Sequence, residues 1–131
     1  LRGLSPGTLE QTLTPEGLPL VVVRPSAPRA TVILAHGCAG PSVRRDAIWA
    51  SRLAEAGYAT VAFDSWAWRG IPGGVCRTAA VSGDERVREV ALVMAWLRAQ
   101  TWPRGPVFVM GWSLGGTTAL ATAREGLGVA R

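Results

Sequence analysis

The chain has 131 residues, enough for one domain that buries about two-thirds of its unfolded surface. Of its residues 48% are hydrophobic and 18% are charged, but no apolar run approaches the ~20 residues that a membrane-spanning helix requires. The net charge of +5 comes from arginines scattered between Arg2 and Arg131, with no lysine and no basic stripe. We therefore expect a single domain, residues 1–131, with no membrane span and no nucleic-acid partner.

The first elements predicted are a β-hairpin and a buried strand. Residues 8–13 and 19–24 are strand-like runs, and the Pro- and Gly-containing stretch between them is typical of a hairpin turn, so that the hairpin covers about residues 8–24. Residues 30–35 are almost continuously apolar, as expected for a strand buried on both faces. This strand leads into the sequence His36-Gly37-Cys38-Ala39-Gly40.

A helix, a strand and a long loop follow. From about residue 44 to 56 apolar side chains recur at helical spacing, and Gly57 is of the type that ends a helix. Residues 58–63 predict a second buried strand. Residues 64–83 have no periodicity but contain tryptophans, glycines and prolines, which predicts a long, packed loop.

A second helix begins with a capping motif. The sequence Ser82-Gly83-Asp84-Glu85 has the Ser-x-x-Glu form of a capping box, which precedes a helix that ends before Pro103. Its expected apolar stripe comprises Val87, Val90, Met94 and Leu97.

The last strand and helix flank a tight serine turn. The apolar run 107–110 leads into Gly111-Trp112-Ser113-Leu114-Gly115-Gly116, and helical spacing follows to about residue 124. A Cβ at Gly111 or Gly115 would collide with the neighbouring strand or helix, so the turn has the properties of a nucleophile elbow. The strained backbone would expose the Ser113 hydroxyl, and the start of the helix would stabilise negative charge beside it. The alternative is an ordinary turn with an incidental serine.

The order of elements predicts an α/β fold. Strands alternate with helices over about residues 30–125, which indicates a mostly parallel sheet with helices on both faces. Right-handed crossovers put the carboxyl ends of the parallel strands on one rim. We therefore expect the turn at His36, the loop that begins at Asp64, and Ser113 to meet there.

These motifs resemble the amino-terminal half of an α/β-hydrolase, most closely of the dienelactone hydrolase family, over Leu18 to about Glu125. The resemblance implies a serine hydrolase of esters, lactones or related small acyl substrates, with no cofactor. It assigns Ser113 as the nucleophile and the backbone N–H groups of Leu114 and Cys38 as the oxyanion hole, whose donors typically contribute a hundredfold or more in rate. The lone histidine and two cysteines, without a C-x-x-C pair, do not indicate a metal site.

Two departures from the family pattern qualify this interpretation. Dienelactone hydrolases typically use a cysteine nucleophile, whereas this chain has Ser113. In this fold the triad acid and histidine follow the serine, yet only Glu125 follows Ser113 and no histidine does. We therefore expect a fragment truncated after the elbow helix, inactive alone although its parent is an enzyme. The rival interpretation is a non-catalytic binding or scaffolding module.

Other residues at the rim have two interpretations each. His36 is either a base or, as in the family, a residue that shapes the oxyanion loop together with Gly37. Asp64 is either an acid or a structural residue that caps its own loop or pairs with Arg69. Both are expected in the structural role.

The tryptophans and cysteines are also left open. Trp66, Trp68 and Trp112 would line a substrate pocket or cover the core. Cys38 and Cys76 would be buried thiols or a disulfide. We expect a cytoplasmic protein, or a periplasmic or secreted one if the disulfide forms. The outer edge of the elbow strand is expected to lack a partner, which favours self-association.

Overall fold

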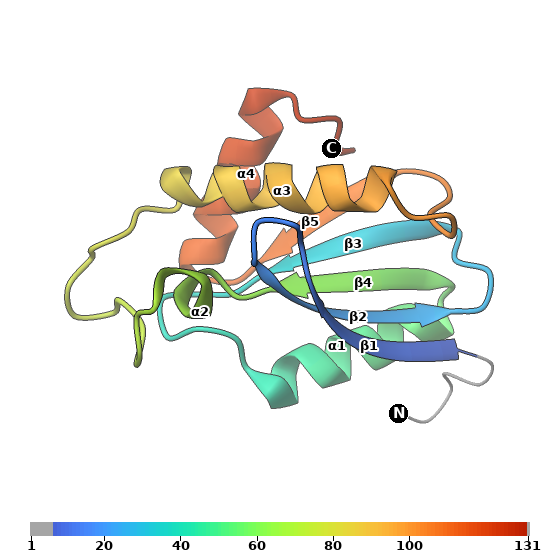
Figure 1. The fold of residues 1–131 in the computed structure, drawn as a ribbon, viewed down its shortest axis with the longest axis horizontal. Coiled ribbons are helices and arrows are strands. Elements are labelled where there is room, and N and C mark those ends of the chain that lie inside the picture. The colour runs from blue at the N-terminus through green and yellow to red at the C-terminus, as the bar shows by residue number, and fades with distance from the viewer. Residues whose placement is uncertain (1–6, 131) are drawn as a thin grey trace.

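The computed structural model describes residues 7–130, which form a five-stranded sheet with helices on both faces (Figure 1). The strands are β1 (Gly7–Leu13), β2 (Pro19–Pro25), β3 (Ala30–Ala35), β4 (Tyr58–Phe63) and β5 (Val107–Gly111). The helices are α1 (Val43–Glu55), α2 (Ser65–Arg69), the 3₁₀ turn η1 (Asp84–Arg86), α3 (Val87–Arg98) and α4 (Leu114–Glu125). The predicted α/β class is confirmed.

The sheet order is β1-β2-β4-β3-β5. The hairpin strands β1 and β2 pair antiparallel, β2 joins β4 antiparallel, and β4, β3 and β5 are parallel. The hairpin turn is held by Thr14, whose hydroxyl accepts the N–H of Leu18 at 3.1 Å, and by Gly17 at φ +88°. In the part of the sheet that the structure describes, β5 pairs only with β3, so the elbow strand is at the edge, as expected.

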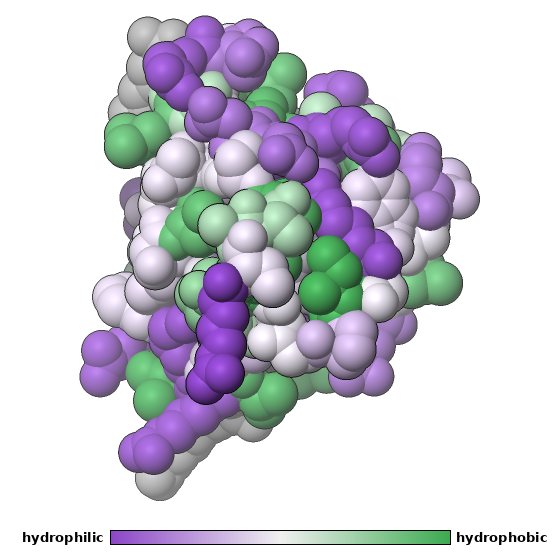
Figure 2. Space-filling view, turned by 90° about the vertical axis from the view of Figure 1, so that its left-hand side faces the viewer, coloured by the Kyte–Doolittle hydropathy of each residue, from purple (hydrophilic) through white to green (hydrophobic). Residues whose placement is uncertain are grey.

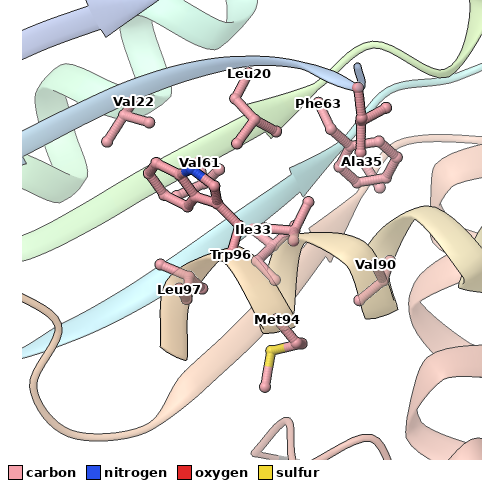
Figure 3. Close-up of a cluster of buried hydrophobic side chains, with 12 residues drawn as sticks. Leu20, Val22, Ile33, Ala35, Val61, Phe63, Val90, Met94, Trp96 and Leu97 are labelled. Atoms are coloured by element: carbon pink, nitrogen blue, oxygen red, sulfur yellow. The ribbon is translucent and has the colours of Figure 1, made fainter. Parts of the chain in front are cut away.

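The main core lies between the sheet and α3. Alternate residues of the central strands, Ile33 on β3 and Val61 and Phe63 on β4 among them, point toward Val90 and Leu97 of α3 (Figure 3). Helix α1 packs on the opposite face, so each face of the parallel strands is apolar. This explains why β3 is buried in every residue, whereas the edge strand β5 is only half-buried.

The segment 64–83 is not all loop, which corrects the sequence prediction. It begins with the short helix α2, which is capped at its N-terminus by Asp64 and ends at Gly70 with φ +66°. Five residues are too few to show helical periodicity, so only the caps mark this helix in the sequence.

The predicted capping box forms. The N–H of Glu85 donates to the Ser82 hydroxyl at 3.1 Å, and the N–H of Ser82 donates to the Glu85 carboxylate at 3.4 Å. It opens the short turn η1, which continues directly into α3. Over residues 7–130, no helix combines the length and apolarity needed to cross a membrane.

Candidate active site

The carboxyl ends of β3, β4 and β5 lie level with one another at one rim of the sheet (Figure 1). The strand register aligns Ala35 with Phe63 and with Gly111, the last residues of the three strands. His36, Asp64 and Trp112 directly follow these positions. The three segments that the sequence places at the rim therefore do meet there, and Figure 2 looks onto them.

Ser113 occupies a strained turn between β5 and α4. Its backbone has φ 54° and ψ −118°, a region that residues with a side chain rarely adopt. A Cβ on Gly111 would lie 2.0 Å from the Gly115 carbonyl oxygen, and a Cβ on Gly115 would lie 2.0 Å from the Ala35 carbonyl oxygen. Glycine is therefore required at both positions, and the turn projects Ser113 into solvent.

The segment 36–40, which we call the oxyanion loop, is in direct contact with this turn. A Cβ on Gly37 would lie 3.2 Å from the Trp112 carbonyl oxygen and 3.4 Å from the Ser113 Cβ. The N–H of Trp112 also donates to the Ala35 carbonyl at 3.2 Å. The loop can approach the serine so closely only because residue 37 has no side chain.

Both ring nitrogens of the buried His36 are engaged. Its Nε2 accepts the N–H of Ser65 at 3.0 Å, so the hydrogen of the neutral ring is on Nδ1, which donates to the Gly37 carbonyl at 2.7 Å. Burial first, and then the positive charge of Arg86, lower the pKa of His36 to about 4. His36 is therefore neutral at pH 7, and neither nitrogen is free to act as a base on Ser113.

The hydrogen bond from His36 also orients the next peptide unit. The Gly37 carbonyl accepts from His36 Nδ1 and from the N–H of Gly40 at 3.1 Å. Because a trans peptide is planar, the N–H of Cys38 points to the opposite side from this carbonyl. The Cys38 carbonyl in turn accepts the Trp66 indole N–H at 2.9 Å and the N–H of Val75 at 2.9 Å. Both peptide units around Cys38 are thus fixed.

A buried arginine that the sequence analysis missed supports this loop. Arg86 is fully buried, and it donates through Nη1 to the His36 carbonyl at 2.6 Å and through Nε to the Ser65 hydroxyl at 2.9 Å. Burial lowers its pKa to about 10, so it stays charged at neutral pH. The signal in the sequence that indicates its burial is its position four residues before Val90, in line with the apolar stripe of α3.

Asp64 caps α2 and does not pair with Arg69. Its Oδ1 accepts the N–H groups of Trp66 at 3.1 Å and Ala67 at 2.9 Å. Arg69 instead forms an ion pair with the buried carboxylate of Glu89 on α3. Of the two structural roles expected for Asp64, capping is therefore observed and pairing with Arg69 is not, because the Arg69 guanidinium binds Glu89 and the Ser65 carbonyl, the latter at 3.3 Å.

The three candidate tryptophans lie in different surroundings. Trp66 is buried and donates its indole N–H to the Cys38 carbonyl, so it supports the oxyanion loop. Trp68 packs against the main core, and its indole N–H donates to the Glu16 carbonyl in the hairpin turn at 3.2 Å. Trp112 lies beside α1, with the guanidinium of Arg45 4.2 Å from its ring centroid.

Cys38 and Cys76 form a disulfide, one of the two alternatives left open by the sequence. It links the oxyanion loop to the exposed end of the segment that follows α2. The backbone also approaches closely here, since a Cβ on Gly74 would lie 2.2 Å from the Cys38 carbonyl oxygen. The loop that carries the candidate oxyanion donor is therefore tied down covalently as well as by hydrogen bonds.

A hollow of about 440 Å³ opens on the rim between residues 39–41 and the segment 64–74. Its lining includes Trp66, but no residue of the elbow. This side of the molecule interleaves hydrophobic and hydrophilic residues (Figure 2). Among the residues that the structure describes, no three His, Cys, Asp or Glu side chains gather to hold a metal ion.

A mostly parallel sheet with a strained serine turn after a parallel strand is the fold of an α/β-hydrolase. Residues 26–128 match the family model described as serine aminopeptidase, S33, and the chain belongs to this α/β-hydrolase family. No curated protein matches the chain.

Solved structures with this fold include several hydrolases. A dienelactone hydrolase from Anabaena variabilis is 23% identical with a TM-score of 0.72, over 92% of this chain and 57% of that one. An α/β-hydrolase from a Penicillium species is 19% identical with a TM-score of 0.72, over 95% and 44%. An esterase from Pyrococcus furiosus is 21% identical with a TM-score of 0.65, over 95% and 46%. The chain thus spans about half the length of these proteins.

Proposed function

We propose that this chain is the nucleophile-bearing half of a serine hydrolase that acts on esters, lactones or related acyl compounds. The observation that carries the proposal is the strained backbone of Ser113, at φ 54°, in contact with the oxyanion loop. Strain of this kind costs about 1–3 kcal/mol and concentrates at functional sites. The likeness to a dienelactone hydrolase and an esterase supports the acyl-substrate class.

In the proposed mechanism, Ser113 Oγ attacks the substrate carbonyl carbon while a base takes its proton. The backbone N–H groups of Leu114 and Cys38 donate to the oxyanion of the tetrahedral intermediate. The leaving alkoxide departs with that proton, which leaves an acyl-enzyme, and water then releases the acid. His36 is engaged through both nitrogens, so the triad acid and histidine come from residues outside this chain.

Labelling with an active-site-directed fluorophosphonate tests the nucleophile in the full-length protein. We expect one labelled site, and Ser113→Ala should abolish its labelling. Ser26→Ala, a change at an exposed serine between β2 and β3, should leave the labelling intact. Labelling that persists in Ser113→Ala would show that the nucleophile is elsewhere. No labelling of the folded wild type would favour the binding or scaffolding alternative.

A further inference from the structure

We propose that Arg86 is a positioning residue for the oxyanion loop. Arg86 holds His36 and Ser65, and the Gly37–Cys38 peptide thereby keeps its orientation. The inference rests on the proposed function, because it assigns Arg86 to the geometry of the Cys38 donor. Arg86 itself contacts neither Ser113 nor any reacting atom in this arrangement.

Arg86 joins the ends of two strands from below the rim. It reaches the carbonyl of His36, the first residue after β3, at 2.6 Å and the hydroxyl of Ser65, which follows β4 by two positions, at 2.9 Å. Its guanidinium carbon lies 5.5 Å from the ring centroid of Phe63 and 5.2 Å from that of Trp66. Hydrogen bonds and aromatic rings therefore fix the guanidinium in both position and direction.

The contacts continue without a break to the candidate oxyanion donor. Ser65 donates its N–H to His36 Nε2, which leaves the ring hydrogen on Nδ1. His36 Nδ1–H donates to the Gly37 carbonyl, and that carbonyl sets the direction of the Cys38 N–H. A rotated or protonated His36 ring would lose one of these two bonds, and the peptide would lose its support.

Stability alone does not account for an arginine at this position. Burying a guanidinium costs several kcal/mol, and an apolar side chain of similar size is often as stable. Only a planar fork supplies two donors at the angle that a strand-end carbonyl and a neighbouring hydroxyl require. Its charge also opposes protonation of His36, as does Arg45 more weakly, whereas Asp64 at 4.0 Å favours protonation.

The test compares Arg86→Met, which removes fork and charge, with Arg86→Lys, which keeps the charge alone. Arg88→Met is the matched control, because Arg88 is two residues away and its guanidinium stacks on Trp68 at 4.9 Å, away from the oxyanion loop. The variants are made in the full-length protein with ¹⁵N-labelled histidine, and the His36 signals are assigned by their loss in His36→Gln.

In the wild type and in Arg88→Met we expect His36 in the Nδ1–H tautomer with a pKa of about 4. Arg86→Met should raise this pKa toward the ordinary value of about 6.5. With an aryl ester, kcat should fall about tenfold to a hundredfold in both Arg86→Met and Arg86→Lys, with KM nearly unchanged. Arg86→Lys should keep the low pKa of His36, because lysine retains the positive charge. The two variants therefore separate the effect of the charge from that of the forked pair of donors.

If Arg86→Met does not fold, Ser65→Ala carries the kinetic arm, because it removes one acceptor of the fork and leaves the cation in place. A kcat in Arg86→Lys and Ser65→Ala equal to that of Arg88→Met would overturn the proposal. So would an unchanged tautomer and pKa in a folded Arg86→Met. Absence of Ser113-dependent turnover in the wild type would instead contradict the proposed function. In that case the histidine signals alone would still show whether Arg86 positions the loop.

Discussion

His36 combines complete burial, two hydrogen bonds and a depressed pKa, and these properties affect stability as well as the site. In the unfolded chain the imidazole takes up a proton near pH 6.5, whereas in the fold it does so only near pH 4. The contribution of the neutral ring is therefore complete above pH 6.5 and is lost progressively as the pH falls to 4. Over this window the free energy of unfolding should fall by about 3 kcal/mol.

Urea unfolding between pH 7 and pH 5 measures the upper part of this loss, above the range where most carboxylates titrate. The control is His36→Gln, whose amide cannot titrate and which should show a nearly flat profile over the same window. Equal pH dependence in the two proteins would show that the imidazole is not held neutral by the fold.

The elbow strand, turn and helix form one unit, and two adjacent glycines at the start of its helix have different surroundings. Gly115 has no room for a Cβ, which would lie 2.0 Å from the Ala35 carbonyl oxygen, whereas a Cβ on Gly116 would lie 3.8 Å from the Gly111 carbonyl oxygen, its nearest neighbour outside α4. Gly115→Ala should push α4 away from β3 and destabilise the fold by about 3 kcal/mol.

Gly116→Ala is the matched control and should stabilise the fold by about 0.5–1 kcal/mol, because alanine is the better helix former. Denaturant unfolding of both variants in the full-length protein gives the comparison. Similar stabilities for the two would mean that the close approach at Gly115 does not exist in solution.

The strands and the elbow were predictable because their signals are local. Apolar runs mark β3 and β4, and the Gly-x-Ser-x-Gly spacing marks the turn itself, although only the collision at Gly111 is local, since a Cβ on Gly115 would meet Ala35 of β3. The role of Arg86 was not predictable, because its acceptor on His36 lies 50 residues away in sequence and a buried arginine looks like any other charge on a helix. The partner of Arg69 was missed for the same reason, since Glu89 comes from a different helix.

At the scale of the whole molecule, the disulfide closes a loop across the rim. Cys38 and Cys76 are separated by 38 residues, for which loop-closure entropy predicts a stabilisation of about 4 kcal/mol. Protein isolated from its native compartment should show no free thiol under denaturing, non-reducing conditions, and reduction should lower its Tm. A Cys38→Ser, Cys76→Ser double variant should match the reduced protein. Two reactive thiols would exclude the disulfide and the oxidising compartment that it implies.

Within residues 7–130, β5 pairs on one side only, with β3, which predicts how the 131-residue chain behaves alone. Edge strands pair readily with other chains, and Leu120 on α4, the helix that packs on β5, is 72% exposed. We expect self-association, and hydrolysis of aryl esters no faster than in Ser113→Ala. Phe108→Lys on β5 should reduce association measured by light scattering, whereas Ala95→Lys on the exposed face of α3 should not. A monomer with a sharply cooperative transition and Ser113-dependent turnover would contradict this expectation.

The left-handed backbone of Ser113 has a consequence for how this sequence can change over time. A glycine at position 113 would adopt the same φ of 54° without the clash that any Cβ introduces. Replacement by glycine therefore relieves backbone strain, but the resulting protein lacks the hydroxyl and with it the proposed nucleophile. A lineage with no use for the hydroxyl would drift toward glycine, whereas one that relies on Ser113 as a nucleophile would keep the serine in spite of the strain.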